Sequence, residues 1–135
     1  MKNQAAPADQ NDTQLCKQAA VDFMRLGAAG RVDEAYQKYV DMRGKHHSPY
    51  FVAGFAALKK AMIDNHNQFS NKQLVVKHVL GDGDLVAVHS HVVLTPGDKG
   101  IATLHLFRFR ENKIVELWDF GQPVSADSPN QDGIF

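Results

Sequence analysis

The most informative stretch of the chain is Phe107-Arg108-Phe109-Arg110-Glu111-Asn112-Lys113-Ile114-Val115-Glu116-Leu117-Trp118-Asp119. Apolar and polar residues alternate on both sides of Glu111-Asn112, which predicts two antiparallel strands joined by a tight turn. A two-residue loop needs positive φ at both positions, which suits Asn-Gly and fits Glu poorly. We therefore expect a three-residue loop in which Asn112 takes the left-handed conformation.

In that register, the odd-numbered residues of both strands share one face of the hairpin. This face combines apolar side chains with one imidazole and one carboxylate: His105, Phe107, Phe109, Val115, Leu117 and Asp119. The imidazole and the carboxylate are then directly opposite or diagonally adjacent. The other face is too apolar for plain exposure to solvent, with Leu104, Leu106, Arg108, Arg110, Glu116, Trp118 and Phe120. We expect Leu104, Leu106 and Trp118 to pack against a second copy in a symmetric homodimer, while Arg108, Arg110 and Glu116 form cross-strand ion pairs.

The rest of the chain divides into helices and then strands. Apolar residues at steps of three and four predict helices over 13–26 and 54–68, with a short helix between them that places Tyr36 and Tyr39 on one side. Alternating, β-branched segments predict strands at 74–80, 85–94, 101–110 and 113–120. Residues 42–49 are rich in turn formers, and we expect a loop there. Helices that precede an antiparallel sheet indicate an α+β fold, with about three helices on the concave side of a curved, largely four-stranded sheet.

Length and charge narrow the classes of function. A chain of 135 residues fits one domain, which we place at 13–124, between an N-terminal tail at 1–12 and a C-terminal tail at 125–135. The formal net charge is zero, which argues against nucleic acid and membrane surfaces as partners. The N-terminal residues contain no apolar run typical of a signal peptide, and we expect a cytoplasmic protein. The single cysteine, Cys16, is expected to be a small buried hydrophobic residue.

Asp119 and His105 are the candidate catalytic residues. A carboxylate at the mouth of an apolar cavity loses hydration and becomes a stronger base toward a carbon acid. A neighbouring imidazole could relay protons or donate a hydrogen bond to the oxyanion that forms beside the carbon. The alternative is structural: Asp119 caps backbone amides at a strand end, and His105 is a hydrogen-bonded core histidine.

Other histidines have two interpretations each. His89 and His91 share a strand face and could chelate zinc, copper or nickel with His78 or His105, but no cysteine or carboxylate cluster completes such a site, and we expect no metal. His46 and His47 lie in the predicted loop before the third helix. His47 could line the mouth of a pocket or could bond only to backbone. Tyr39 is expected in the core, where it could also shape the cavity.

The hairpin 107–119, followed by Gln122-Pro123, resembles the last hairpin of SnoaL-like proteins of the nuclear transport factor 2-like superfamily. The resemblance extends to His47-Ser48-Pro49, to Val86-Ala87-Val88-His89 and to the closing residues 130–135. It implies a conical barrel, frequent homodimers and no cofactor. In polyketide cyclases of that family, the aspartate of the Trp-Asp pair is the acid/base of an aldol closure, and that position is Asp119. Those enzymes also use a histidine fourteen residues earlier, which is His105 here. Leu117 stands where a cyclase has a polar histidine, and Ser48 replaces an asparagine.

From the residues and the resemblance together, we expect a cofactor-free enzyme with aldol cyclase or isomerase chemistry on a small hydrophobic substrate. Asp119 and His105 would be catalytic. The substrate would contact His47, Phe107, Leu117, Tyr39 and His89. The alternative is a ligand-binding or dimerisation module of the same fold. A cavity of roughly 300 Å³ with Asp119 inside favours the enzyme, whereas Asp119 paired with an arginine or turned away favours the module.

Overall fold

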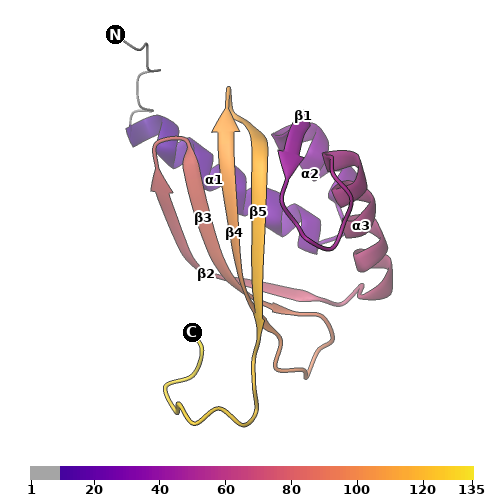
Figure 1. The fold of residues 1–135 in the computed structure, drawn as a ribbon, viewed down its shortest axis with the longest axis vertical. Helices are drawn as coiled ribbons and strands as arrows, with labels where there is room; N and C mark the ends of the chain where they lie inside the picture. The colour runs from indigo at the N-terminus through magenta and orange to yellow at the C-terminus, as the bar shows by residue number, and fades with distance from the viewer. Residues whose placement is uncertain (1–9) are drawn as a thin grey trace.

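A computed structural model describes residues 10–135 as helices that precede and flank one mixed sheet. Within these residues there are three helices, α1 (Gln10–Ala28), α2 (Val32–Tyr39) and α3 (Phe55–Gln68). The five strands are β1 (Val40–His46), β2 (Gln73–Asp82), β3 (Leu85–Val93), β4 (Ile101–Arg110) and β5 (Lys113–Pro123). The strand order is β1-β5-β4-β3-β2, and only the β1–β5 pair is parallel (Figure 1).

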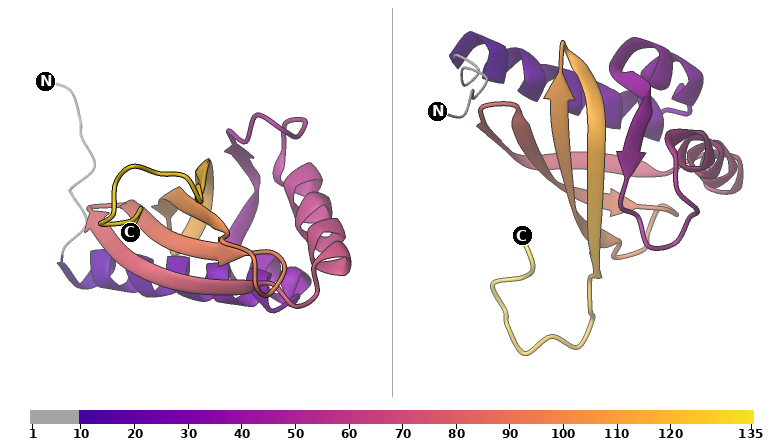
Figure 2. Two further views of the ribbon diagram at one scale, coloured as in Figure 1. Left: turned by 90° about the horizontal axis from the view of Figure 1, so that it is seen from below. Right: turned by 45° about the horizontal axis from the view of Figure 1, so that its top comes forward.

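The sheet curves strongly, and α1 runs across its concave side (Figure 2). The core lies between them, where Phe23 of α1 meets Phe107 of β4 edge-to-face at 5.8 Å. Tyr36 of α2 contacts both Phe23 and Phe55 of α3 in the same manner. Edge-to-face aromatic pairs contribute about 0.5–1.5 kcal/mol beyond the burial of their area. The predicted α+β cone is therefore confirmed, with Cys16 buried in its core as expected.

The fifth strand, β1, was not predicted. Its sequence, VDMRGKH, has buried residues only at its two ends, Val40 and His46, so it lacks the alternation by which the other strands can be identified. Pairing with β5 at the edge of the sheet holds it extended. The sheet is thus five-stranded and mixed, and the prediction of four antiparallel strands is wrong by this one strand.

The β4–β5 hairpin closes differently from the prediction. Arg110 pairs with Lys113 across a two-residue loop, and both Glu111 (φ 52°) and Asn112 (φ 65°) are left-handed. The expected three-residue loop is therefore wrong. Positive φ at both central residues gives the turn whose twist matches the flanking strands, and the pairing of two long strands offsets the roughly 1–2 kcal/mol strain at a non-glycine residue.

A β-bulge at Val115 restores the register that the shorter loop would have lost. Phe109 pairs with Ile114, but Arg108 pairs with Glu116, which leaves Val115 as the extra residue of β5. Ile114 is fully buried, whereas Val115 is only half-buried. Val115 was predicted on the cavity face, and this position is corrected to the bulge. Gly44 of β1 fits against it, because a Cβ at Gly44 would overlap the Val115 carbonyl oxygen.

The two ends of the domain differ slightly from expectation. Helix α1 begins at Gln10 rather than at Thr13, and residues 1–9 of the expected tail lie outside the described residues. Beyond β5, residues 124–135 turn back toward the sheet, and the Phe135 ring lies 4.5 Å from that of His91. None of the helices within residues 10–135 is both long and apolar enough to cross a membrane.

Candidate active site

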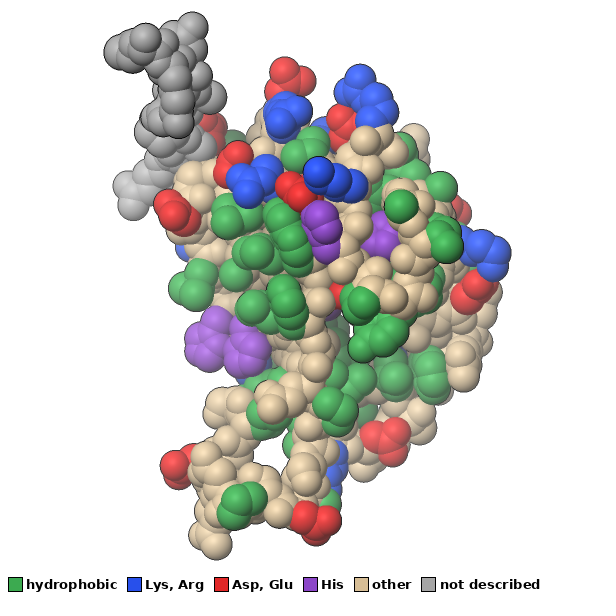
Figure 3. Space-filling view, viewed as in Figure 1, with side chains coloured by type: hydrophobic (Ala, Val, Ile, Leu, Met, Phe, Trp, Pro, Cys, Tyr) green, Lys and Arg blue, Asp and Glu red, His purple; other side chains and the backbone are tan. Residues whose placement is uncertain are grey.

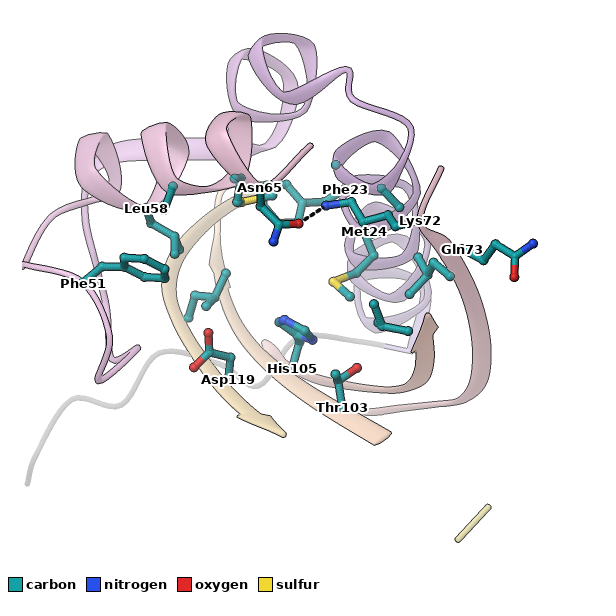
Figure 4. A pocket seen from close by; sticks show the side chains of 17 residues that line it. Phe23, Met24, Phe51, Leu58, Asn65, Lys72, Gln73, Thr103, His105 and Asp119 are labelled. Carbon is teal, nitrogen blue, oxygen red and sulfur yellow. Dashed lines mark hydrogen bonds between the residues drawn. The ribbon is translucent and has the colours of Figure 1, made fainter. Parts of the chain in front are cut away.

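A cavity of about 290 Å³ lies between α1, α3 and the concave face of the sheet (Figure 4). Most of its wall is apolar, and six of its side chains are polar: Asn65, Lys72, Gln73, Thr103, His105 and Asp119. The remaining lining residues are Phe23, Met24, Gly27, Ala28, Phe51, Leu58, Ala61, Met62, Leu74, Val92 and Leu117. This volume lies at the lower end of the range of about 300–1,000 Å³ that is usual for small-molecule sites.

His105 and Asp119 are direct partners across β4 and β5. Both side chains line the cavity, and they lie on the same side of it in Figure 4. The bulge at Val115 brings about this arrangement. With a two-residue loop and no bulge, the partner of His105 would be Trp118, and Asp119 would lie on the outer face. One extra residue in β5 therefore places the carboxylate inside.

The His105 ring lacks a partner on one nitrogen. Its Nδ1 is buried and makes no hydrogen bond to any described residue. An unsatisfied buried polar atom costs about 1–3 kcal/mol, and such an atom beside a cavity is a candidate for a functional role. Phe107 packs its ring nearly parallel to the imidazole, with centroids 6.2 Å apart, and restricts the orientation of the imidazole.

Burial lowers the pKa of His105 below its ordinary value, and the opposing attraction of Asp119 is the smaller effect. The imidazole is therefore neutral at physiological pH. A neutral imidazole carries one N–H donor and one acceptor nitrogen, whereas the imidazolium carries two donors. This state fits a ring that donates one hydrogen bond to an oxygen in the cavity, beside a carboxylate that can accept a proton.

Asn65 and Lys72 form the opposite wall (Figure 4). Lys72 lies just before β2, and its Nζ donates a 2.5 Å hydrogen bond to Oδ1 of Asn65 on α3. Burial lowers the pKa of Lys72. Neither Lys72 nor Asp119 takes part in any of the ion pairs found within residues 10–135. The cavity thus has a cationic wall and an acidic wall.

Among the five predicted substrate contacts, only Leu117 lines the cavity. Phe107 is fully buried beneath the floor, where it supports His105. Tyr39 lies at the end of α2, and its hydroxyl donates a hydrogen bond to Asp22 of α1. Tyr39 shares a separate surface depression with Asp22 and Lys113. Phe107 and Tyr39 are therefore corrected from substrate contacts to supporting residues.

His47 points away from the cavity. Because residues alternate along β1 and its extension, His46 is buried on the inner side and His47 lies on the outer side. The His47 ring stacks on Trp118 at 4.9 Å, and its Nε2 lies 2.6 Å from Oε2 of Glu116. The His46 ring donates a hydrogen bond from Nε2 to the Val52 carbonyl oxygen, and its Nδ1 accepts a hydrogen bond from the Ser48 backbone N–H. The expected role of His47 at the mouth of the pocket does not fit this position.

His89 also lies on the outer face, because its neighbour Val88 pairs with His105 on the inner face. The His89 ring stacks on that of His78, with the two Nδ1 atoms 2.9 Å apart. His91 bonds to the Lys99 carbonyl oxygen. Within residues 10–135, no group of three or more potential metal ligands is close enough to hold an ion. His89 is thus corrected from a cavity residue to an outer-face residue.

Exposed apolar side chains gather on this outer face (Figure 3). They include Leu104, which is 37% exposed, and Phe120, Val75 and Leu80, which are more exposed. Trp118 is partly covered by His47 and by Arg108, whose guanidinium carbon lies 5.9 Å from the ring centroid. Arg108 also contacts Glu116 at 3.5 Å, as predicted from the pairing of β4 with β5.

Sequence reasoning missed Lys72, Asn65 and Phe51. Lys72 follows the predicted third helix as an isolated basic residue, and nothing in its neighbourhood marks it as buried. Asn65 is one of many polar residues on that helix. Phe51 lies in an exposed loop between Tyr50 and Val52, and its side chain still lines the cavity. These positions depend on how α3 packs against the sheet, and the local sequence around each residue does not predict that packing.

The chain has the nuclear transport factor 2-like fold, as its similarity to solved structures shows. A SnoaL-like protein of unknown function from Burkholderia thailandensis aligns with a TM-score of 0.69 at 16% identity, over 87% of this chain and 99% of that one. A protein from Kribbella flavida with a proposed ketosteroid isomerase activity aligns with a TM-score of 0.68 at 18% identity, over 90% of this chain and 87% of that one. A protein from Acidithiobacillus ferrooxidans with a proposed polyketide cyclase activity aligns with a TM-score of 0.64 at 18% identity, over 80% of this chain and 88% of that one. At these identities the likeness shows the fold alone.

Residues 18–117 match the SnoaL-like domain, so the chain belongs to the SnoaL-like family. The match includes His105 and ends two residues before Asp119. No curated protein is significantly similar to the chain in sequence. Any assignment of chemistry therefore depends on the cavity itself.

Proposed function

We propose that this protein catalyses proton abstraction from a carbon next to a carbonyl group, within the cavity lined by His105 and Asp119. The observation that carries the proposal is the unpartnered, buried Nδ1 of His105 directly across from a carboxylate that has no ion-pair partner among residues 10–135. Buried histidine nitrogens are mostly hydrogen-bonded in folded proteins; His66 also has an unpartnered buried Nδ1, but only His105 lines the cavity and faces a carboxylate across the strands. A structural aspartate would be paired or would cap backbone amides.

In the proposed step, the Asp119 carboxylate accepts the proton from the α-carbon of the substrate. The electron pair of the broken C–H bond forms the C=C bond of an enolate, and the carbonyl oxygen takes the negative charge. The neutral His105 donates a hydrogen bond to that oxygen, which stabilises the charge as it develops. The largely apolar wall lowers the local dielectric constant, which strengthens this interaction.

The enolate has two fates that the family resemblance suggests. Its carbon could attack a second carbonyl of the same molecule, which forms a C–C bond as in an aldol closure. Alternatively, Asp119 could return the proton to a different carbon, which moves a double bond. Both reactions begin with the same step, so the proposal concerns that step. The small cavity favours a compact apolar substrate.

The test is incorporation of solvent deuterium at the α-carbon of small apolar ketones and 1,3-dicarbonyl compounds, followed by NMR. We expect exchange with the parent protein and a rate at least about 100-fold lower with Asp119→Asn, since a positioned base contributes about 10²–10⁴-fold. Asp98→Asn, in the exposed turn between β3 and β4, is the matched control and should match the parent. Binding without Asp119-dependent exchange across the panel would reject the proposal and leave a ligand-binding module.

A further inference from the structure

The cavity contains one feature that proton abstraction does not use. Lys72 and Asn65 lie on the wall opposite Asp119 and His105 (Figure 4). Lys72 is half-buried and has no carboxylate partner among the described residues; its Nζ bonds to the neutral amide oxygen of Asn65. A cation removed from water without a counterion is costly, and the lowered pKa of Lys72 reflects that cost.

The hydrogen bond from Lys72 also fixes what Asn65 can offer a ligand. Because Oδ1 of Asn65 accepts from Lys72, the amide group that remains is an N–H₂ donor. In Figure 4 the side-chain nitrogen of Asn65 points toward the interior of the cavity. This wall therefore presents an ammonium and an amide donor side by side, a combination that accepts an anion or a strongly accepting oxygen and excludes a cationic group.

The opposite wall has the reverse preference. Asp119 repels an anion, and the neutral His105 can donate only one hydrogen bond. A ligand with one anionic end thus has a single favourable orientation, with its charge at Lys72 and its uncharged, carbonyl-bearing part near Asp119 and His105. The residues between the two walls, such as Met24, Met62 and Leu74, suit an apolar body.

We propose that Lys72 and Asn65 form a carboxylate-binding end of the cavity, and that the ligand is a small apolar carboxylic acid whose reactive carbonyl lies at the other end. The inference deepens the proposed function and rests on it for the carbonyl end. The carboxylate would accept hydrogen bonds from Nζ of Lys72 and Nδ2 of Asn65, and it would hold the α-carbon at Asp119. Lys72 is a specificity-determining residue in this scheme and takes no part in proton transfer.

The experiment compares two ligands of nearly equal shape, 3-phenylpropanoate and 3-phenylpropanamide, by calorimetry at neutral pH. We expect the parent protein to bind the carboxylate at least about tenfold more tightly than the amide, because hydrogen bonds to a charged group are the stronger ones. Lys72→Met should abolish that preference, and Lys72→Arg should retain part of it. Lys77→Met is the control, since Lys77 lies in the following strand β2 with its ammonium group over the Phe135 ring, and this variant should behave as the parent does.

Equal affinity for the two ligands in the parent, or a preference that survives Lys72→Met, would overturn the inference, as would failure of 3-phenylpropanoate to bind at millimolar concentration. Asp119→Asn separates this result from the proposed function. That variant should bind 3-phenylpropanoate at least as tightly as the parent while losing deuterium exchange. Charge selectivity that depends on Lys72, in a protein without exchange activity, would support the carboxylate end and reject the enolisation.

Discussion

Protonation of His105 should destabilise the folded protein, and the effect can be worked out from its surroundings. Burial holds the pKa of His105 below its ordinary value in the folded state, and attraction to Asp119 only partly offsets this. The unfolded chain, in which an imidazole titrates near 6.5, therefore binds the proton more readily. The free energy of unfolding should change little near pH 7.5 and should fall as the pH drops below about 6.5.

The size of the effect has a simple upper limit. If the folded imidazole stays neutral, uptake of one proton on unfolding lowers the free energy of unfolding by at most about 1.4 kcal/mol for each unit that the pH falls. With an unfolded pKa near 6.5, the total loss between pH 7.5 and pH 5.0 is about 2 kcal/mol. The carboxyl groups whose pKa is lowered in the folded state, such as Asp41 and Glu116, titrate at still lower pH. The window from pH 6.5 to 5.0 therefore isolates histidine.

Urea unfolding of the parent protein and of His105→Gln, measured from pH 5.0 to 7.5, tests this reasoning. The glutamine variant removes the titrating group and should show a flatter dependence of unfolding free energy on pH. His91→Gln, on the outer face, is the control and should retain the parent's slope. An unchanged slope in His105→Gln would refute the assignment. A parent that gains stability on acidification would show that the attraction between His105 and Asp119 outweighs burial.

Two further predictions concern the architecture. Gly44→Ala should lower the free energy of unfolding by about 1–3 kcal/mol, since its Cβ would overlap the Val115 carbonyl oxygen and overpack the junction of β1 with the bulge. Gly121→Ala, whose Cβ would meet only Ile101 at 3.4 Å, is the control, and equal denaturation midpoints for the two variants would contradict the account. Leu104→Lys should weaken the homodimer that we propose on the outer face, and this can be measured by sedimentation velocity. Identical sedimentation of variant and parent across protein concentrations would argue against that interface.

The hairpin shows both the reach and the limit of sequence-based prediction. The prediction that His105 and Asp119 share a face depends on one extra residue somewhere between β4 and β5. That residue was expected in the loop, and it lies at Val115 instead. The two arrangements give the same pairing farther along the strands, so the facing residues were right while the loop and Val115 were wrong. Alternation of apolar and polar residues shows which residues share a face of the sheet. It does not show at which position the extra residue of a bulge lies.

The remaining errors have a common cause. His47 and Lys72 take their positions from contacts between distant segments, the first through the pairing of β1 with β5 and the second through the packing of α3 against the sheet. The polar, irregular sequence of β1 gives no local indication of a strand, so the side on which His47 lies could not be predicted. Leu117, in contrast, belongs to a strongly alternating strand, and its predicted place at the cavity is correct.

Binding of a carbonyl ligand between His105 and Asp119 should be visible directly by imidazole nitrogen NMR. In ¹⁵N-labelled protein titrated with acetylacetone, the neutral His105 ring should donate a hydrogen bond to the ligand. The His105 ring resonances should shift to saturation as acetylacetone is added, while those of His78, His89 and His91 on the outer face should stay in place. Saturable binding that leaves the His105 resonances unchanged, or that shifts only the outer-face histidines, would contradict binding at this site.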